Sequence, residues 1–162
     1  MCESSKKGGN AASGDEIQEA KQLDTEVNGV VLHQFLRVTD ERGKLSAVEL
    51  EQVLPFTPRR LFVVYDVPSS SLRGEHAHHT CHQFLVCLSG TCKVMVDDGT
   101  NRQEFQLDAS WRGLYVPPLI WAAQHSFSAE IAVLVLASQA YDASDYIRDY
   151  DEFLRAIQKV HE

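Results

Sequence analysis

The chain has 162 residues, of which 44% are hydrophobic, and a formal net charge of −8. This length suits one domain with one core, and the apolar content predicts a packed globule. Nucleic acid is not expected as a partner, because phosphate neutralisation needs clustered Lys and Arg. No continuous apolar run of about eighteen residues is present, so the sequence predicts no membrane-spanning helix.

The first 27 residues read as a mobile N-terminal tail, because they lack hydrophobic periodicity and carry Gly, Ser and Asn. Residues 28–162 are expected to form a single domain. The start of the chain has no apolar segment of the kind found in secretory signals. The cysteines, at positions 2, 81, 87 and 92, form neither a C-x-x-C pair nor a regular framework. Reduced thiols and a cytoplasmic location are therefore expected, with Cys87 as a small buried hydrophobe.

Short apolar segments separated by turn residues follow the tail. Strands are expected at 29–38, 59–68, 83–90, 92–99, 102–108, 113–118 and 132–138. Turns are expected at 40–44, at Ser89-Gly90 and at Asp98-Gly99. Short strands with turns every eight to twelve residues or so are typical of an all-β sandwich or barrel. Only the end of the chain, 145–162, predicts an amphipathic helix, with apolar residues at three- and four-residue steps from Tyr146 to Ile157.

Four of the seven histidines lie within residues 76–82. Alternate side chains on a strand share a face, so His76 and His78 are expected to point the same way, and His79 the other way. The H-x-H pattern, followed by Gln83 and then by a glycine, resembles the first cupin motif. Metal-binding cupins carry Glu where this chain has Gln83.

The second cupin motif would fall at 117–125, where Ala122 occupies the position of the expected third histidine. A metal-binding cupin presents three imidazoles and one carboxylate, whereas this chain keeps only His76 and His78. A neutral amide at Gln83 also offers no charge to a divalent ion, so we expect a site without metal. His79 and His82 are interpreted as solvated or turn-lining residues. The alternative for the inner pair is two satisfied side chains in a barrel wall.

Several segments together resemble a known family, the dTDP-4-keto-6-deoxyglucose 3,4-ketoisomerases, which are the FdtA- and QdtA-like or WxcM-like cupins. They are RGEHAHHTCHQFLVCLSGTCKVMVDDG, GLYVPPLIWAAQHSFS, AVLVLAS and YDASDYIRDYDEFL, within residues 28–157. The resemblance implies an RmlC-like antiparallel β-barrel or jelly roll with a C-terminal helix, and a homodimer. It also implies a cofactor-free enzyme of deoxysugar biosynthesis for surface polysaccharides, with His76 and His78 as catalytic residues and Arg73 in the site.

Moving a ketone from C4 to C3 of a hexose requires a base at C3, a donor for the enediolate oxygens and an acid at C4. A neutral imidazole titrates near neutrality and can take and return a proton. Arginines suit the diphosphate or the enediolate, amides suit hydroxyl groups, and aromatic rings can stack on the base or sugar. The candidate substrate contacts are Arg73, Arg60, Gln83, Tyr65, Tyr115 and Trp121.

Some of these candidates have a simpler alternative, namely a surface charge for Arg73 and a core position for Tyr115 and Trp121. Three other functions also stay open: a nucleotide-sugar 3,5-epimerase, a non-catalytic sugar-nucleotide-binding cupin and a metal-dependent dioxygenase. The sequence does not say which of His76 and His78 is the base, nor which face of C4 receives the proton.

Overall fold

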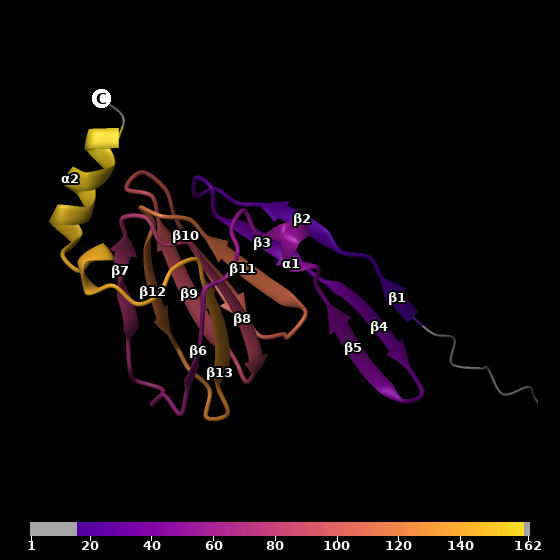
Figure 1. The fold of residues 1–162 in the computed structure, drawn as a ribbon. Helices are drawn as coiled ribbons and strands as arrows, with labels where there is room; N and C mark the ends of the chain where they lie inside the picture. Colours follow the sequence, from indigo (N-terminus) through magenta and orange to yellow (C-terminus); the bar gives the residue numbers. More distant parts are fainter. Residues whose placement is uncertain (1–15, 161–162) are drawn as a thin grey trace, which may run out of the picture.

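The computed structural model describes residues 16–160 (Figure 1). The first strands are β1 (Glu16–Gln18), β2 (Lys21–Asp24), β3 (Val31–Gln34), β4 (Leu36–Asp40), β5 (Gly43–Ala47), β6 (Arg60–Tyr65) and β7 (Arg73–His78). The later ones are β8 (Gln83–Ser89), β9 (Cys92–Asp97), β10 (Arg102–Leu107), β11 (Arg112–Val116), β12 (Trp121–His125), β13 (Ala132–Ala137) and β14 (Tyr146–Ile147). The helices are α1 (Leu50–Val53), the 3₁₀ turn η1 (Ala143–Asp145) and α2 (Tyr150–Val160).

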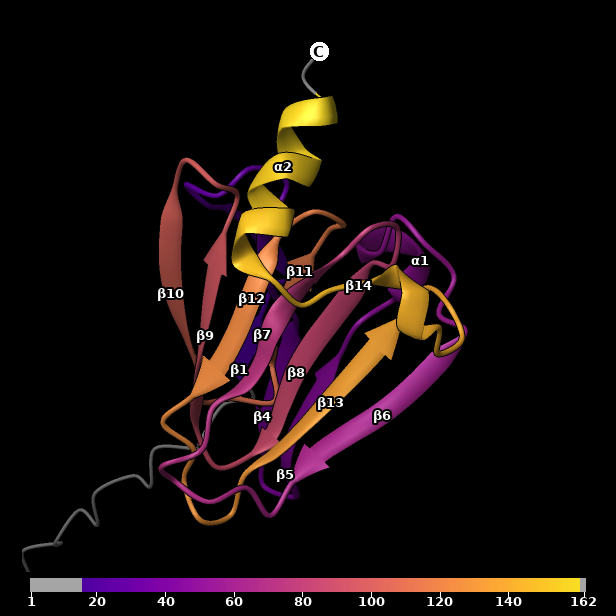
Figure 2. The same cartoon turned by 90° about the vertical axis from the view of Figure 1, so that its left-hand side faces the viewer.

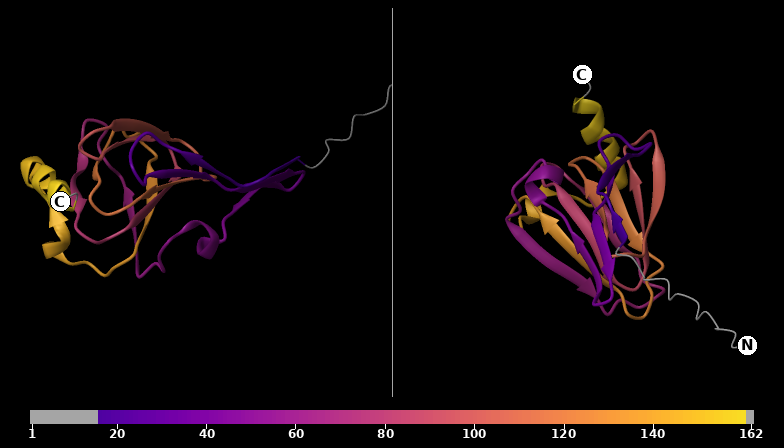
Figure 3. Two further views of the ribbon diagram at one scale, coloured as in Figure 1. Left: turned by 90° about the horizontal axis from the view of Figure 1, so that it is seen from above. Right: turned by 90° about the vertical axis from the view of Figure 1, so that its right-hand side faces the viewer.

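Two antiparallel sheets form the body of the molecule. One has the order β10-β9-β12-β7-β14, and the other has the order β2-β3-β11-β8-β13-β6. Seen from above, they curve around a common interior, while α2 packs outside the first sheet (Figures 2 and 3). The strands expected from 59 onward are present, so the all-β prediction is confirmed.

The interior is filled by the alternate side chains that face inward from both sheets. Val94 and Val96 of β9 belong to the same buried cluster as Leu85, Cys87 and Leu114 of the other sheet. Period-two alternation therefore decides which side chains reach the interior. Burial raises the pKa of the Cys87 thiol, as expected for a small buried hydrophobe.

A second unit, which we call the arm, is the three-stranded sheet β1-β4-β5. It projects from the body on the side opposite α2 (Figure 1). The single strand expected at 29–38 is in fact two strands, because the chain leaves the body at buried Phe35. β3 stays in the body sheet beside β11, and β4 enters the arm.

The expected boundary of the N-terminal tail differs from the structure. β1 pairs with β4, β2 pairs with β3, and Val27 is buried in the main core, so residues 16–27 belong to the folded part. The side chains of β1 and β2 are mostly exposed, and pairing through backbone groups leaves no hydrophobic pattern to read. The remainder of the expected tail, 1–15, lies outside the described residues.

The C-terminal helix begins later than predicted. Asp149 accepts a hydrogen bond from the Glu152 amide at 2.8 Å, which caps the first turn, and Tyr146 lies in β14 rather than in the helix. Phe153 is fully buried against the outer face of the first sheet. Within residues 16–160, no helix is long and apolar enough to cross a membrane.

The docking of α2 through Phe153 leads to a first prediction. Phe153→Ala should lower the free energy of unfolding by about 3–5 kcal/mol, because it empties a fully buried site. Gln158→Ala is the matched control on the exposed side of the same helix, and it should change stability by less than about 0.5 kcal/mol. Urea unfolding followed by circular dichroism measures both. Equal small changes would show that the helix contributes little to the fold.

Candidate active site

The strand β7 is distorted just before its histidines. Gly74 and Glu75 have positive φ angles of 85° and 52°, and the pairing with β12 shifts its register between Ala122 and Ala123. A Cβ atom on Gly74 would lie 2.9 Å from the Ala122 carbonyl oxygen, so only glycine fits without displacement. The bulge bends β7 just before its two histidines. Strained backbone of this kind is typical of functional sites.

His76 is a half-buried side chain on the inner face of β7. Its Nδ1 lies 2.8 Å from the carbonyl oxygen of Gly74, which can only accept, so Nδ1 carries the proton. Nε2 is then the nitrogen with the free lone pair. Burial lowers the pKa of His76, the Gly74 bond opposes this, and the charge of Arg148 lowers the pKa further. The ring is therefore neutral at neutral pH and can accept a proton.

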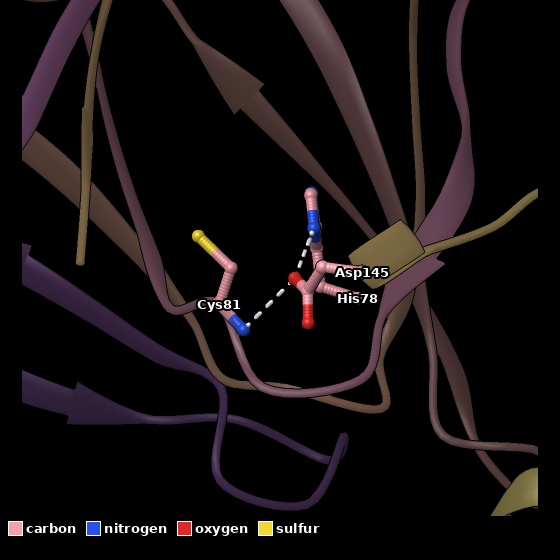
Figure 4. A group of neighbouring side chains, drawn as sticks. All are labelled: His78, Cys81 and Asp145. Carbon is pink, nitrogen blue, oxygen red and sulfur yellow. Dashed lines mark hydrogen bonds and ion pairs between the residues drawn. The ribbon is translucent and has the colours of Figure 1, made fainter. Parts of the chain in front are cut away.

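His78 lies behind His76, with ring centroids 5.0 Å apart, and is almost fully buried. Its Nδ1 is 2.9 Å from Oδ2 of Asp145 (Figure 4). Burial, followed by the charge of His76, lowers the pKa of His78 to about 4, although the Asp145 hydrogen bond opposes the shift. At neutral pH this contact is therefore a hydrogen bond from a neutral imidazole to a carboxylate. On the other side of the ring, Nε2 lies 3.2 Å from Nε2 of Gln83.

The inner faces of the strands line a cavity of ≈ 380 Å³. Three residues proposed from the sequence reach its wall, namely Arg73, His76 and Gln83. A larger hollow of ≈ 640 Å³ beside α2 contains surface side chains such as Arg155 and Lys159, and neither histidine of the pair. The smaller cavity is the candidate site, because the neutral imidazole of His76 and several polar side chains converge on it.

Two polar atoms near this cavity are buried without a hydrogen-bond partner in the described part of the chain. They are Nε of Arg60 and Oε1 of Gln124. Gln124 lines the cavity, and the guanidinium carbon of Arg60 lies 5.2 Å from the ring centroid of Phe62, another lining residue. A ligand that bonds these atoms would remove the cost of leaving them unpaired.

The three aromatic residues proposed from the sequence lie on outer faces. Tyr65 is 70% exposed, on the face of β6 opposite Phe62. Tyr115 packs outside the second sheet, and Trp121 lies under α2, in edge contact with Tyr150. The structure therefore does not bring Tyr65, Tyr115 or Trp121 to the cavity. Strand alternation is the reason, because each of these residues occupies a position whose side chain points to the outer face.

The outer histidines also differ from each other. His79 is exposed just after the end of β7, as expected for a solvated or turn-lining residue. His82 is not solvated: its Nδ1 lies 2.7 Å from the hydroxyl of Tyr115, and its ring packs beside Phe56. It therefore belongs to the aromatic cluster outside the second sheet.

Tyr146 and Arg148 also line the cavity and, like Gln124, were not predicted from the sequence. The Tyr146 ring lies 4.9 Å from the His76 ring and 4.4 Å from the His78 ring. The Arg148 guanidinium lies over the Tyr146 ring at 4.4 Å. The sequence prediction placed Tyr146 and Arg148 in the C-terminal helix, so neither was considered as a strand residue facing the site. Strand alternation was the available signal, because the residues on either side of buried Ile147 share the opposite face.

His78, Cys81 and Asp145 offer ligand atoms within 4.8 Å of one another (Figure 4). They do not fit a metal ion, because the Asp145 oxygens already accept four hydrogen bonds. The cupin metal position is also unsuited to a cation. Ala122 pairs with His76 across β7 and β12 and offers no ligand atom, and Gln83 is neutral.

Comparisons with known proteins agree with this arrangement. A family model described as "FdtA: WxcM-like, C-terminal" matches residues 28–158. The chain is 43% identical over 127 residues to the TDP-4-oxo-6-deoxy-alpha-D-glucose-3,4-oxoisomerase of Aneurinibacillus thermoaerophilus, covering 78% of this chain and 91% of that protein.

Two solved structures show the same architecture. A variant of the 3,4-ketoisomerase QdtA from Thermoanaerobacterium thermosaccharolyticum, in complex with TDP-4-keto-6-deoxyglucose, has a TM-score of 0.77 at 32% identity, covering 82% of this chain and 96% of that one. NovW, a 4-keto-6-deoxy sugar epimerase from Streptomyces spheroides, has a TM-score of 0.70 at 19% identity, covering 86% and 76%, which shows the fold alone. The cupin-type fold is thus confirmed, and the chain belongs to the FdtA family of WxcM-like proteins.

Proposed function

We propose that the protein is a nucleotide-sugar 3,4-ketoisomerase that converts dTDP-4-keto-6-deoxyglucose into a dTDP-3-keto-6-deoxyhexose. The observation that carries this proposal is the state of His76, a neutral imidazole with its free Nε2 lone pair at the wall of the cavity. Two relatives support the substrate class: the Aneurinibacillus protein is named for this reaction, and QdtA binds the 4-keto sugar nucleotide.

The reaction needs one base and a stabilised enediolate. Nε2 of His76 takes the proton from C3, and the electrons of that bond form the C3–C4 double bond as the C4 carbonyl becomes an enediolate oxygen. The same imidazolium then returns a proton to C4 while the C3 hydroxyl loses its proton and becomes the ketone. One hydrogen moves from C3 to C4 and one from O3 to O4, so the sugar needs no external oxidant, reductant, metal or cofactor.

The unequal surroundings of the two histidines support His76 as the base. Both ring nitrogens of His78 are engaged, one by Asp145 and the other by Gln83, and its pKa of about 4 keeps it neutral. His78 is also buried behind the cavity wall. We therefore assign proton transfer to His76 and a supporting role to His78.

Positive charge at the cavity suits an anionic substrate. Arg73 and Arg148 line it, Arg60 lies beside it, and the chain as a whole has a net charge of −8. Guanidinium groups bind diphosphate and enediolate oxygens through paired hydrogen bonds. Gln83 and Gln124 provide amide groups for sugar hydroxyls.

The assignment of the base predicts the behaviour of histidine variants. His76→Asn should lower turnover about a hundred- to ten-thousand-fold, because Asn cannot carry a proton at neutral pH. His79→Asn is the matched control and should keep the wild-type rate, since His79 is exposed just after the end of β7. Product NMR with a chelator present measures rate and ketone position. A product that keeps its ketone at C4 would instead indicate an epimerase, and full activity of His76→Asn would exclude the proposed base.

The lowered pKa of His76 predicts the pH dependence of turnover. Protonated His76 cannot accept the C3 proton, so the acid limb of kcat/KM should lie below the ordinary histidine pKa of about 6.5. Arg148→Gln removes a positive charge that disfavours the imidazolium, so this limb should move to higher pH. Arg155→Gln, on the exposed side of α2, should leave it in place. A limb that stays fixed or moves to lower pH in Arg148→Gln would contradict the assignment.

We also propose a homodimer in the cytoplasm. The arm is a single layer that exposes Ile17 and Leu45, and the outer face of β6 exposes Leu61, Val63 and Tyr65. A single sheet layer normally needs a second layer to cover its apolar side chains. The described cysteines, at positions 81, 87 and 92, are free thiols, which fits a reducing compartment.

Light scattering at micromolar concentration should therefore give twice the chain mass of 18.2 kDa. Leu45→Glu and Val63→Glu should shift the mass toward one chain, because each places a charge within an apolar contact. A control with Gln158→Glu, on the exposed side of α2, should stay dimeric. A single-chain mass for the wild-type protein would exclude the dimer.

A further inference from the structure

We propose that Asp145 is a positioning residue that acts through His78 to fix the amide orientation of Gln83 at the cavity wall. Asp145 ends η1, and His78 ends β7, 67 residues earlier in the chain. This inference rests on the proposed ketoisomerase function, because it gives Gln83 the task of presenting hydrogen-bonding groups to the sugar.

The Asp145 carboxylate is held by four donors. Oδ1 accepts from the amide and the hydroxyl of Thr80 at 2.8 and 2.7 Å. Oδ2 accepts from the Cys81 amide at 3.2 Å and faces Nδ1 of His78 at 2.9 Å. Burial raises the pKa of Asp145, but hydrogen bonds from Thr80, His78 and Cys81 outweigh this and leave the pKa lowered. Asp145 is therefore ionised and can only accept hydrogen bonds.

An ionised Asp145 decides the tautomer of His78. Since the carboxylate cannot donate, the proton of the neutral ring must sit on Nδ1, and Nε2 must carry the lone pair. The polar group of Gln83 next to Nε2 must then be the amide NH₂, at 3.2 Å. The opposite amide orientation would place a carbonyl oxygen against a lone pair, which is repulsive.

The chain of contacts ends at the cavity. Gln83 lines it, whereas His78 is only 6% exposed. With one amide hydrogen committed to His78, the second hydrogen and the carbonyl oxygen of Gln83 remain for a ligand. Asp145 does not contact the sugar, because it acts on His78, and His78 in turn orients Gln83. Residues that orient a contacting residue in this way tune a site without touching the substrate. In a cupin with Glu in place of Gln83, this neutral hydrogen bond to His78 could not form.

The tautomer is measured directly by nitrogen-15 NMR of the histidine rings in the wild-type protein. We expect His78 to show a protonated Nδ1 and an unprotonated Nε2 at neutral pH, and to lose this single tautomer in Asp145→Asn. Asp142→Asn is the matched control: it is the same substitution three residues away, and Asn caps η1 as well as Asp does. A wild-type ring protonated at Nε2 would overturn the proposal.

A double-mutant cycle then tests whether Asp145 acts through Gln83. Asp145→Asn should lower kcat/KM about 10- to 100-fold. In a Gln83→Leu background the same change should cost far less, because the group that Asp145 orients is already gone. Independent, additive losses would show a purely structural role for Asp145 and would overturn the proposal. Asp142→Asn should give kcat/KM close to the wild-type value.

Gln83→Glu provides a test that does not depend on the folding of Asp145→Asn. A carboxylate beside Nε2 of His78 favours the imidazolium, so the His78 titration should move up from about 4 toward 6.5. An unchanged titration would place Gln83 outside the relay and overturn the proposal. If the wild-type protein leaves the 4-keto sugar unchanged, the proposed function fails, but the histidine NMR still decides the relay.

Discussion

The buried carboxylate of Asp145 is the constraint on which the site depends. A buried charge is tolerated only when it is fully hydrogen-bonded, and the four donors of Asp145 all come from the short segment around His78, Thr80 and Cys81. These bonds tie the C-terminal segment to the end of β7. Beside that contact, β14 pairs with β7, and Tyr146 lies against both histidine rings.

Two neighbouring imidazoles thereby obtain different chemical states from the same strand. His76 bonds a backbone carbonyl and keeps its second nitrogen free, whereas His78 has both nitrogens engaged. Burial lowers the pKa of both rings and keeps them neutral. Neither ring therefore adds a positive charge that would repel the arginines as they bind an anionic substrate. A single proton carrier in a positively charged cavity is sufficient for an isomerisation in which the hydrogens only change places within the sugar.

Much of the body and part of the site could be predicted from the sequence. Alternating apolar strands identified the sheets, and the H-x-H spacing identified His76 and Gln83, because these features depend on local periodicity. Arg73 came from the family resemblance. Tyr115 and Trp121 were predicted at the cavity but lie outside it, because their aromatic character was considered without the strand face that each side chain occupies.

Asp145 could not be found locally, because its partners lie about 65 residues away in the chain. Residues 16–24 were missed as strands because their pairing uses backbone groups that any sequence has.

The central claim, that His76 alone removes the C3 proton, is tested most directly by following that proton on the 4-keto sugar. The 4-keto sugar nucleotide is incubated with the wild-type protein, His76→Asn or His78→Asn, and proton NMR follows the C3 signal. We expect the C3 proton signal of the 4-keto sugar to disappear with the wild-type protein and, more slowly, with His78→Asn, and to persist with His76→Asn. Loss of the C3 proton signal with His76→Asn, together with its persistence in His78→Asn, would contradict the account and make His78 the base.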